Sequence, residues 1–238
     1  MINCTMMNKK LSGLFGTVFF SFSGIGLLAT TAIAAETAVK PDIKINTKMD
    51  AKIDPRKETA LAKAALEMMQ ASFKTRGQAS VDRLQQDETQ ALCSQYQDNP
   101  PKAVRVRIEA INQKLLKYPA DGKLLGDWKE GEKIAQSGVG KQFSDNPETP
   151  AGGNCYACHQ LTKTELSYGN IGPSLYNFGK VRGYSEAILK YTYGKISNSE
   201  AFSACSNMPR FGHGGILTEQ QLKHVTALLM DPESPVNK

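Results

Sequence analysis

The sequence predicts an all-α protein, with an N-terminal helical extension at residues 35–120 and a second helical domain at residues 121–238. Three observations support this prediction. Apolar residues recur at the spacing of a helix with one buried face. Several of these runs begin at a capping residue and end at Gly or Pro. The alternating apolar and polar pattern of a β-strand is nearly absent.

The first 34 residues have the layout of a secretory signal peptide. Lys9 and Lys10 precede an apolar run over residues 11–29, and Ala32-Ile33-Ala34 offers a cleavage site. An uncleaved membrane anchor is the alternative, but Gly and Ser dilute the run and no stop-transfer charges follow it. We therefore expect cleavage near residue 34, a periplasmic location, and no membrane span in the mature chain.

The sequence of the extension predicts two or three helices, each with a narrow apolar face. The first begins at Asp54-Pro55, where aspartate is a good N-cap and proline suits the first turn, and Gly77 is a suitable stop. A weaker helix is expected over residues 80–96 and a clearer one over residues 104–115. Because such faces are too narrow for an independent core, we expect this region to wrap around the second domain or a partner.

The sequence of the second domain predicts short helices joined by loops. The first helix covers residues 127–135, and a loop rich in Gly, Pro, Asn and Ser follows it as far as residue 154. Ser185 can cap the next helix, which we expect to close at Gly194. In the last helix Thr218 and Gln221 form a capping box, and Asp231-Pro232 ends it.

The segment Cys155-Tyr156-Ala157-Cys158-His159 carries the strongest chemical signal. Cys-x-x-Cys-His is the attachment signature of a c-type haem. Cysteines three apart share one helical turn, so both sulfurs can reach the vinyl groups on one porphyrin edge, and the adjacent histidine can bind iron. A redox dithiol or half of a zinc site are the alternatives, but no βαβ pattern and no second Cys pair accompany the motif. We predict one covalent haem c, attached by Cys155 and Cys158, with His159 as an axial ligand.

The second axial position has four candidates, namely Met208, His213, His224 and Met230. His224 and Met230 lie on the predicted last helix, where solvent exposure or packing explains them. Met208 lies in a loop and precedes a proline, so it can present its thioether to the porphyrin. Thioether ligation favours ferrous iron and raises the reduction potential. We predict Met208 as the ligand, with His213 as the alternative.

Two cysteines, Cys93 and Cys205, remain after the haem cysteines are assigned. An even pair in an oxidising compartment favours a disulfide, which would join the extension to the haem domain. Two separate thiols are the alternative, because the sequence does not show that the pair comes within bonding distance.

The charge pattern excludes a typical nucleic-acid binder. The chain has a formal net charge of +6, but its Lys and Arg residues are spread thinly rather than gathered in blocks. We therefore expect no nucleic-acid partner.

The order of these parts resembles class I cytochrome c. That family has a short helix, the C-x-x-C-H motif, a Gly-Pro-x-Leu loop (here Gly172-Pro173-Ser174-Leu175), a helix, a methionine loop and a terminal helix. The resemblance implies a class I cytochrome c-like haem domain. It also implies that the Pro173 carbonyl holds the Nδ1–H of His159, and that the first helix of the domain crosses the last closely at Gly131.

Residues 120–238 also resemble the SoxX family, the monohaem subunits of SoxAX sulfur-oxidation cytochromes. The similar segments are Gly153-Asn154-Cys155-Tyr156-Ala157-Cys158-His159-Gln160-Leu161, Met208-Pro209-Arg210-Phe211-Gly212-His213 and the C-terminal Asp231-Pro232-Glu233-Ser234-Pro235-Val236-Asn237-Lys238. The resemblance implies a heterodimer with SoxA, which carries the catalytic haem, so that no residue of this chain is catalytic. The complex would be an L-cysteine S-thiosulfotransferase that couples thiosulfate oxidatively to a cysteine of the SoxYZ carrier protein. This chain would accept the electrons released and pass them to a small cytochrome c.

Two other functions stay open. The first is a stand-alone periplasmic electron shuttle of the class I cytochrome c type, although a lone shuttle needs only the haem domain. The second is a monohaem enzyme such as a peroxidase, which needs an open distal site and an acid–base group above the iron. His213 could supply that group only if Met208 were not a ligand.

Overall fold

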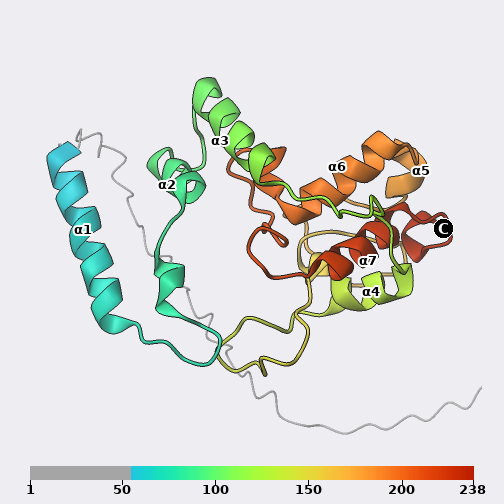
Figure 1. Ribbon diagram of the computed structural model, residues 1–238, viewed down its shortest axis with the longest axis horizontal. Coiled ribbons are helices and arrows are strands. Elements are labelled where there is room, and N and C mark those ends of the chain that lie inside the picture. Colours follow the sequence, from blue (N-terminus) through green and yellow to red (C-terminus); the bar gives the residue numbers. More distant parts are fainter. Residues whose placement is uncertain (1–54) are drawn as a thin grey trace, which may run out of the picture. The chain divides into compact units, whose positions relative to one another are not determined.

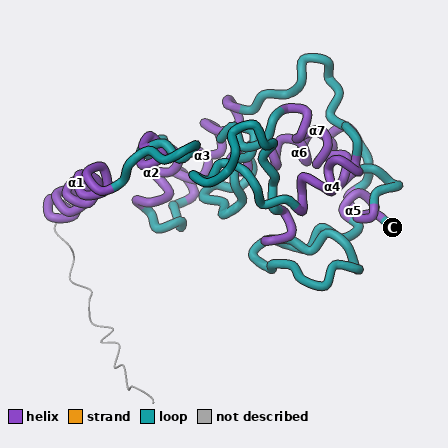
Figure 2. The backbone as a smooth tube through the Cα atoms, turned by 90° about the horizontal axis from the view of Figure 1, so that it is seen from below, coloured by secondary structure: helices purple, strands orange, loops and turns teal. Residues whose placement is uncertain are grey.

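The computed structural model describes the backbone of residues 55–238 and the side chains from Ala60 onwards. This part of the chain is helical and has no β-strand, apart from one isolated bridge between Arg76 and Ala79 (Figure 2). The predicted all-α class is therefore confirmed for residues 55–238. The predicted signal peptide and the Asp54 cap lie outside the described residues. No helix within the described range is long and apolar enough to cross a membrane.

Three α-helices and one 3-10 helix form the described part of the extension. The single helix expected over residues 80–96 is wrong, because Asp87 divides it into two elements. The Asp87 carboxylate accepts a hydrogen bond from the Gln90 amide at 2.8 Å, and the Gln90 side chain accepts one from the Asp87 amide at 3.0 Å. This capping box holds Asp87 in an extended conformation that starts a new helix. The elements are α1 (Pro55–Ser72), η1 (Val81–Leu84), α2 (Glu88–Gln95) and α3 (Lys102–Leu115).

Helices α2 and α3 are tied to the second domain by buried polar contacts. The Asn112 amide nitrogen of α3 donates to the Thr89 hydroxyl of α2 at 2.8 Å, and the Asn198 amide nitrogen donates to the Asn112 side-chain oxygen at 3.0 Å. Asn198 caps η3 (Ser199–Ala201). Because all three side chains are buried, these bonds form away from water and fix α2 and α3 on η3.

The helices of the second domain begin largely where the sequence predicts. Ser185 caps α6 and Thr218 with Gln221 forms the capping box of α7. Helix α6, however, continues past Gly194, where we expected it to close. A Cβ there would lie 2.9 Å from both the Phe202 ring and the Tyr118 hydroxyl, so this glycine allows close packing rather than ending the helix. The elements are α4 (Trp128–Gln136), η2 (Cys155–Ala157), α5 (Phe178–Arg182), α6 (Glu186–Ser197), η3, α7 (Glu219–Met230) and η4 (Pro235–Asn237).

The core of this domain forms around α7, which packs against α4 on one side and α6 on the other (Figure 1). Helix α4 crosses α7 at Gly131, where a Cβ would lie only 2.1 Å from the His224 carbonyl oxygen. The glycine therefore permits a backbone approach that no side chain would allow. The side chains of α7 that belong to the buried hydrophobic cluster are Leu222, Val225, Leu228, Leu229 and Met230.

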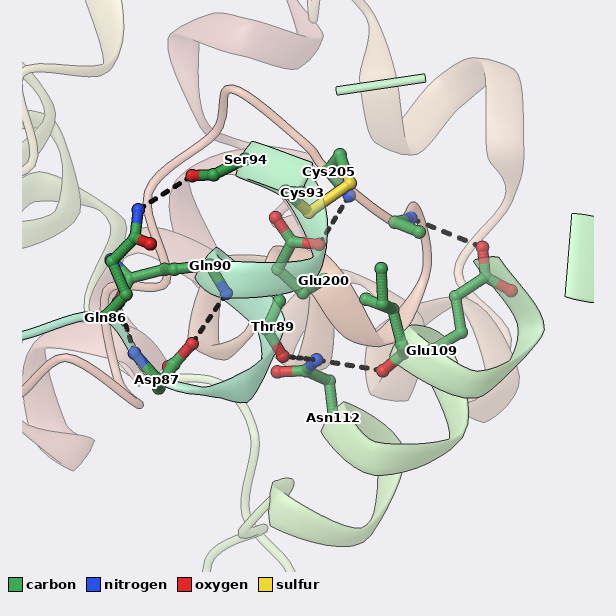
Figure 3. Close-up of a disulfide and its surroundings, with 12 residues drawn as sticks. Gln86, Asp87, Thr89, Gln90, Cys93, Ser94, Glu109, Asn112, Glu200 and Cys205 are labelled. Carbon is green, nitrogen blue, oxygen red and sulfur yellow. Dashed lines mark hydrogen bonds between the residues drawn. A yellow bond between two sulfur atoms is a disulfide. The ribbon is translucent and has the colours of Figure 1, made fainter. Parts of the chain in front are cut away.

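A disulfide between Cys93 and Cys205 joins α2 to the loop after η3 (Figure 3). The two Cα atoms are 5.4 Å apart across 112 residues of sequence. The pairing that the sequence favoured, without deciding it, is present in the structure.

Replacing Gly131 by alanine is expected to lower the free energy of unfolding by about 1–3 kcal/mol, the usual cost of overpacking. The same exchange in an uncrowded helix would have the opposite sign and stabilise by about 1 kcal/mol. Denaturant unfolding measures the difference. Gly138→Ala is the control, since the nearest atom to its new Cβ is the Asn154 side-chain nitrogen at 3.3 Å, which can move. A Gly131→Ala protein as stable as the wild type would contradict the close crossing.

Candidate functional site

The structure brings the four predicted haem-binding side chains to the lining of one cavity. Cys155, Cys158, His159 and Met208 all line a space of about 650 Å³, although Met208 is far from the others in sequence. This volume is in the range of cofactor pockets. The walls come from η2 and the loop after it, α5, α6, the loop before Phe211, and α7. The apolar part of the wall includes Leu161, Leu175, Phe178, Ile196, Phe211 and Leu229.

The cysteines reach the cavity because the loop after α4 turns back along the end of that helix. The Gly153 amide donates to the Ile134 carbonyl at 2.8 Å, and the Asn154 amide donates to the Ser137 carbonyl at 2.9 Å. Asn154 then adopts a left-handed conformation with φ of 46° and starts the 3-10 turn η2. These contacts position the short helical turn that carries Cys155.

Both motif cysteines are free thiols. Burial is the main cause that raises the pKa of the Cys155 thiol to about 12, and the neighbouring Cys158 adds to the rise. Redox-active Cys-x-x-Cys motifs have a lowered thiol pKa, whereas the pKa of the Cys155 thiol is raised.

His159 is oriented by the loop that follows it. Its Nδ1 lies 2.7 Å from the Pro173 carbonyl oxygen. Because a carbonyl only accepts, Nδ1 carries the proton and the Nε2 lone pair is available to a metal. Gly172 makes room for the ring, since a Cβ there would lie 2.1 Å from the imidazole Cε1. The contact implied by the cytochrome resemblance is thus present, while iron ligation by His159 stays a prediction.

Met208 lies half-buried on a loop, and its backbone amide and carbonyl both form hydrogen bonds. Its amide donates to the Ser206 hydroxyl at 3.2 Å, and its carbonyl accepts from the Ser199 hydroxyl at 2.5 Å. These bonds restrain the main chain while the side chain lines the cavity. Ligation of iron by Met208 remains a prediction.

The other three candidates for the second axial position do not line the cavity. Met230 is buried in the core, 3.6 Å from the Thr192 hydroxyl. His213 lies 3.7 Å from the Asp87 carboxylate, and His224 accepts a hydrogen bond from the Asp127 amide at 2.8 Å. The structure therefore places the alternative ligand His213 outside the candidate site.

Two cationic residues on the cavity wall, Arg182 and Lys195, were not expected from the sequence. The Arg182 guanidinium lies over the Phe178 ring at 5.0 Å, and the Lys195 ammonium donates to the Ser199 carbonyl at 3.1 Å. Burial is the main cause that lowers the pKa of Lys195, although the carboxylates of Glu200 and Glu109 oppose it. The described lining contains no Asp or Glu. Helix α5, which carries Arg182, is too short to give a periodic signal, so the sequence pattern could not have placed Arg182 on the cavity wall.

The donor set and the largely apolar lining of the cavity fit a haem c. Two thiols, an oriented imidazole and a thioether are the side chains that attach and ligate this group. An apolar wall suits the macrocycle, and the cations suit its two carboxylates.

A second group of side chains of the metal-binding types includes Cys205, which also lines the cavity. The sulfurs of Cys93 and Cys205 and the Asp98 carboxylate are within 4.8 Å of one another. The disulfide removes the thiolates that a metal would need, so we do not assign a metal here.

The fold and the site define a helical protein with a Cys-x-x-Cys-His motif on the wall of an apolar cavity. No family model matches the chain. The chain is 39% identical over 157 residues to a protein of Aquifex aeolicus (strain VF5) described as an uncharacterized lipoprotein, and the aligned region covers 64% of this chain and 73% of the Aquifex protein. The chain belongs to the same family as this Aquifex lipoprotein.

Replacing Gly172 by alanine is expected to push the His159 ring away from the Pro173 carbonyl. The Nδ1–H proton, protected from exchange by its hydrogen bond in the wild type, should lose its slowly exchanging NMR signal. Ser174→Ala is the control, because that hydroxyl donates to Gln160 at 3.0 Å and not to the histidine. A protected Nδ1–H in the Gly172→Ala protein would show that the loop does not confine the imidazole.

Proposed function

We propose that this chain is an exported electron-transfer protein that carries one covalent haem c, and that it is the SoxX-type subunit of a SoxAX complex. The observation that supports this most is the convergence of Cys155, Cys158, His159 and Met208 on one cavity. Haem c, when bound, supplies reversible one-electron chemistry at its iron. Because the chain has side chains for both axial positions, electron transfer is favoured over catalysis.

Each side chain of the site has a distinct role in this proposal. The sulfurs of Cys155 and Cys158 hold the porphyrin as thioethers. His159 binds iron through Nε2, and the Pro173 carbonyl fixes the ring and raises its basicity. Met208 would supply the second ligand to the iron, and a thioether ligand would favour the ferrous state.

The protein around the ligands controls water and charge. The apolar wall excludes water, and a dry site shifts reduction potentials through its low polarity. The cations of Arg182 and Lys195 offset the charge of the two haem carboxylates.

A class I cytochrome c-like fold is part of the same proposal. The close α4–α7 crossing at Gly131 and the bond between His159 and Pro173 are the features that the resemblance implied. They support this finer class within the all-α fold.

The SoxAX assignment concerns the source and destination of the electrons. In this proposal SoxA holds the catalytic haem, where thiosulfate is joined oxidatively to a cysteine of SoxYZ and two electrons are released. This chain accepts them one at a time and passes them to a small cytochrome c. The support is the similarity of three segments of residues 120–238 to the SoxX family.

Periplasmic export completes the proposal. It is supported by the signal-like sequence of residues 1–34, by the Cys93–Cys205 disulfide, and by the description of the Aquifex relative as a lipoprotein. A stand-alone shuttle would share this location and these ligands, and a test for a SoxA partner separates the two. The peroxidase alternative has less support, since His213 lies outside the cavity and no described Asp or Glu lines it.

Expression of the full chain in a host with a haem-ligation system tests attachment and ligation. The wild type should be coloured, gain the mass of one haem, and show a far-red methionine-to-iron charge-transfer band when ferric. The double variant Cys155→Ala/Cys158→Ala should be colourless and unmodified. Met208→Ala should keep the haem but lose the band, whereas the control Met230→Leu should keep both, because Met230 lies in the core away from the cavity. A colourless wild type of unmodified mass would overturn the proposal.

Mixing the purified holoprotein with a SoxA protein tests the partnership. We expect a one-to-one complex on size-exclusion chromatography, with reduction of the haem of this chain when thiosulfate and SoxYZ are added. A protein that stays monomeric in the mixture would contradict the SoxAX assignment and favour the free shuttle, while leaving the haem assignment intact.

A further inference from the structure

We propose that helix α2, outside the predicted haem domain, positions Met208 by holding the methionine loop (residues 203–210) at two points. One link is the Cys93–Cys205 disulfide and the other is the ion pair between Asp87 and Arg210. The inference rests on the proposed function, in which Met208 is an axial ligand. It assigns a role to part of the N-terminal extension.

The two links flank Met208 in the sequence. Cys205 precedes the methionine by three residues and Arg210 follows it by two. Cys205 also has φ of 57°, a left-handed conformation that residues other than glycine seldom adopt. Its amide donates to the buried Glu200 carboxylate at 2.6 Å (Figure 3). The disulfide and this hydrogen bond together hold the loop in an otherwise unfavourable conformation.

The second link is a short and partly shielded ion pair. The Arg210 Nη2 lies 2.6 Å from the Asp87 Oδ2, and the arginine side chain is only 14% exposed. The other carboxylate oxygen of Asp87 caps α2 by accepting from the Gln90 amide. One side chain therefore fixes the start of α2 and the end of the methionine loop.

Helix α2 is itself held to the second domain by a separate route. Thr89 of α2, Asn112 of α3 and Asn198 before η3 form a buried chain of hydrogen bonds, part of which is drawn in Figure 3. The route from Asn198 through α3 and α2 to the methionine loop closes a ring of contacts. A helix anchored in this way can restrain the loop instead of moving with it.

The two links matter because the side chains that face each other between α2 and the loop are mostly polar. A polar cavity of about 350 Å³ separates α2 from the loop and is lined by Gln90 and Ser94 of α2 and by Asn207, Met208 and Pro209 of the loop. Dispersion contacts across such a gap are weak. The disulfide and the ion pair are therefore the main contacts by which α2 can limit departure of the loop.

The expected consequence is a small population of protein in which Met208 has left the iron. An external ligand such as cyanide binds ferric iron only in that population, so its apparent dissociation constant is the intrinsic constant divided by the open fraction. Removing a link should increase the open fraction and tighten cyanide binding. It should also lower the reduction potential, because the thioether that favours ferrous iron is bound for less of the time.

The experiment uses holoprotein with haem attachment checked by mass. Cys93→Ala/Cys205→Ala removes the covalent link, and Asp87→Asn removes the ion pair while keeping an oxygen that can cap α2. The matched control is Glu88→Gln, which breaks an exposed ion pair between α2 and Arg107 that does not touch the methionine loop. We expect cyanide affinity to rise by about tenfold or more without the disulfide and by about threefold without the ion pair, since affinity follows the open fraction. Glu88→Gln should match the wild type.

The outcomes separate this inference from the proposed function. Wild-type cyanide affinity, charge-transfer band and potential in both link variants would overturn the positioning role, even if their stability falls. If the disulfide variant is not exported, Asp87→Asn against Glu88→Gln still decides the question. A wild type without haem, or without the methionine band, would overturn the proposed function and this inference with it.

Discussion

The close crossing of α4 and α7 is the constraint on which the site depends. Because Gly131 has no side chain, the α4 backbone comes close to the His224 carbonyl of α7. The end of α4 therefore lies beside the central helix of the core. The returning loop bonds to Ile134 and Ser137 at that end and delivers the cysteine motif to the cavity. A wider crossing would shift the motif away from the apolar face of α7. The position of the cysteine motif thus follows from one backbone contact.

The site combines a confined imidazole with a methionine on a loop, an arrangement that agrees with the proposed electron-transfer function. The His159 ring has little freedom, because it is bonded to the Pro173 carbonyl and packs closely against Gly172. Met208 lies on a loop and is restrained by hydrogen bonds from its own main chain. In the proposed function, the histidine supplies a fixed ligand and the methionine a weaker one whose hold depends on the loop. In the proposed holoprotein, structure outside the cavity could therefore influence the iron.

The N-terminal extension gains a physical explanation from this arrangement. It packs on η3 through Asn112 and contacts the methionine loop through a disulfide and an ion pair. A haem domain alone would have to hold its methionine with loop contacts. The extension adds a covalent restraint that resists thermal motion without filling the space beside the loop, which remains a polar cavity. In the proposed complex, this helical segment belongs to the electron-transfer site as much as the haem motif does.

The sequence by itself determined the features that depend on neighbouring residues. The all-α class, the caps at Ser185 and Thr218, and the helical turn at Cys155 could be predicted because each depends on hydrogen bonds or spacing within a few residues. The division of the extension at Asp87 was missed because a cap and a continuing helix compete locally, and the ion pair to Arg210 that supports the cap is distant. Tertiary structure alone decided that Cys93 pairs with Cys205, that α6 continues past Gly194, and that Arg182 and Lys195 line the cavity. These features depend on which surfaces come into contact when the helices pack, and the local sequence pattern does not determine those contacts.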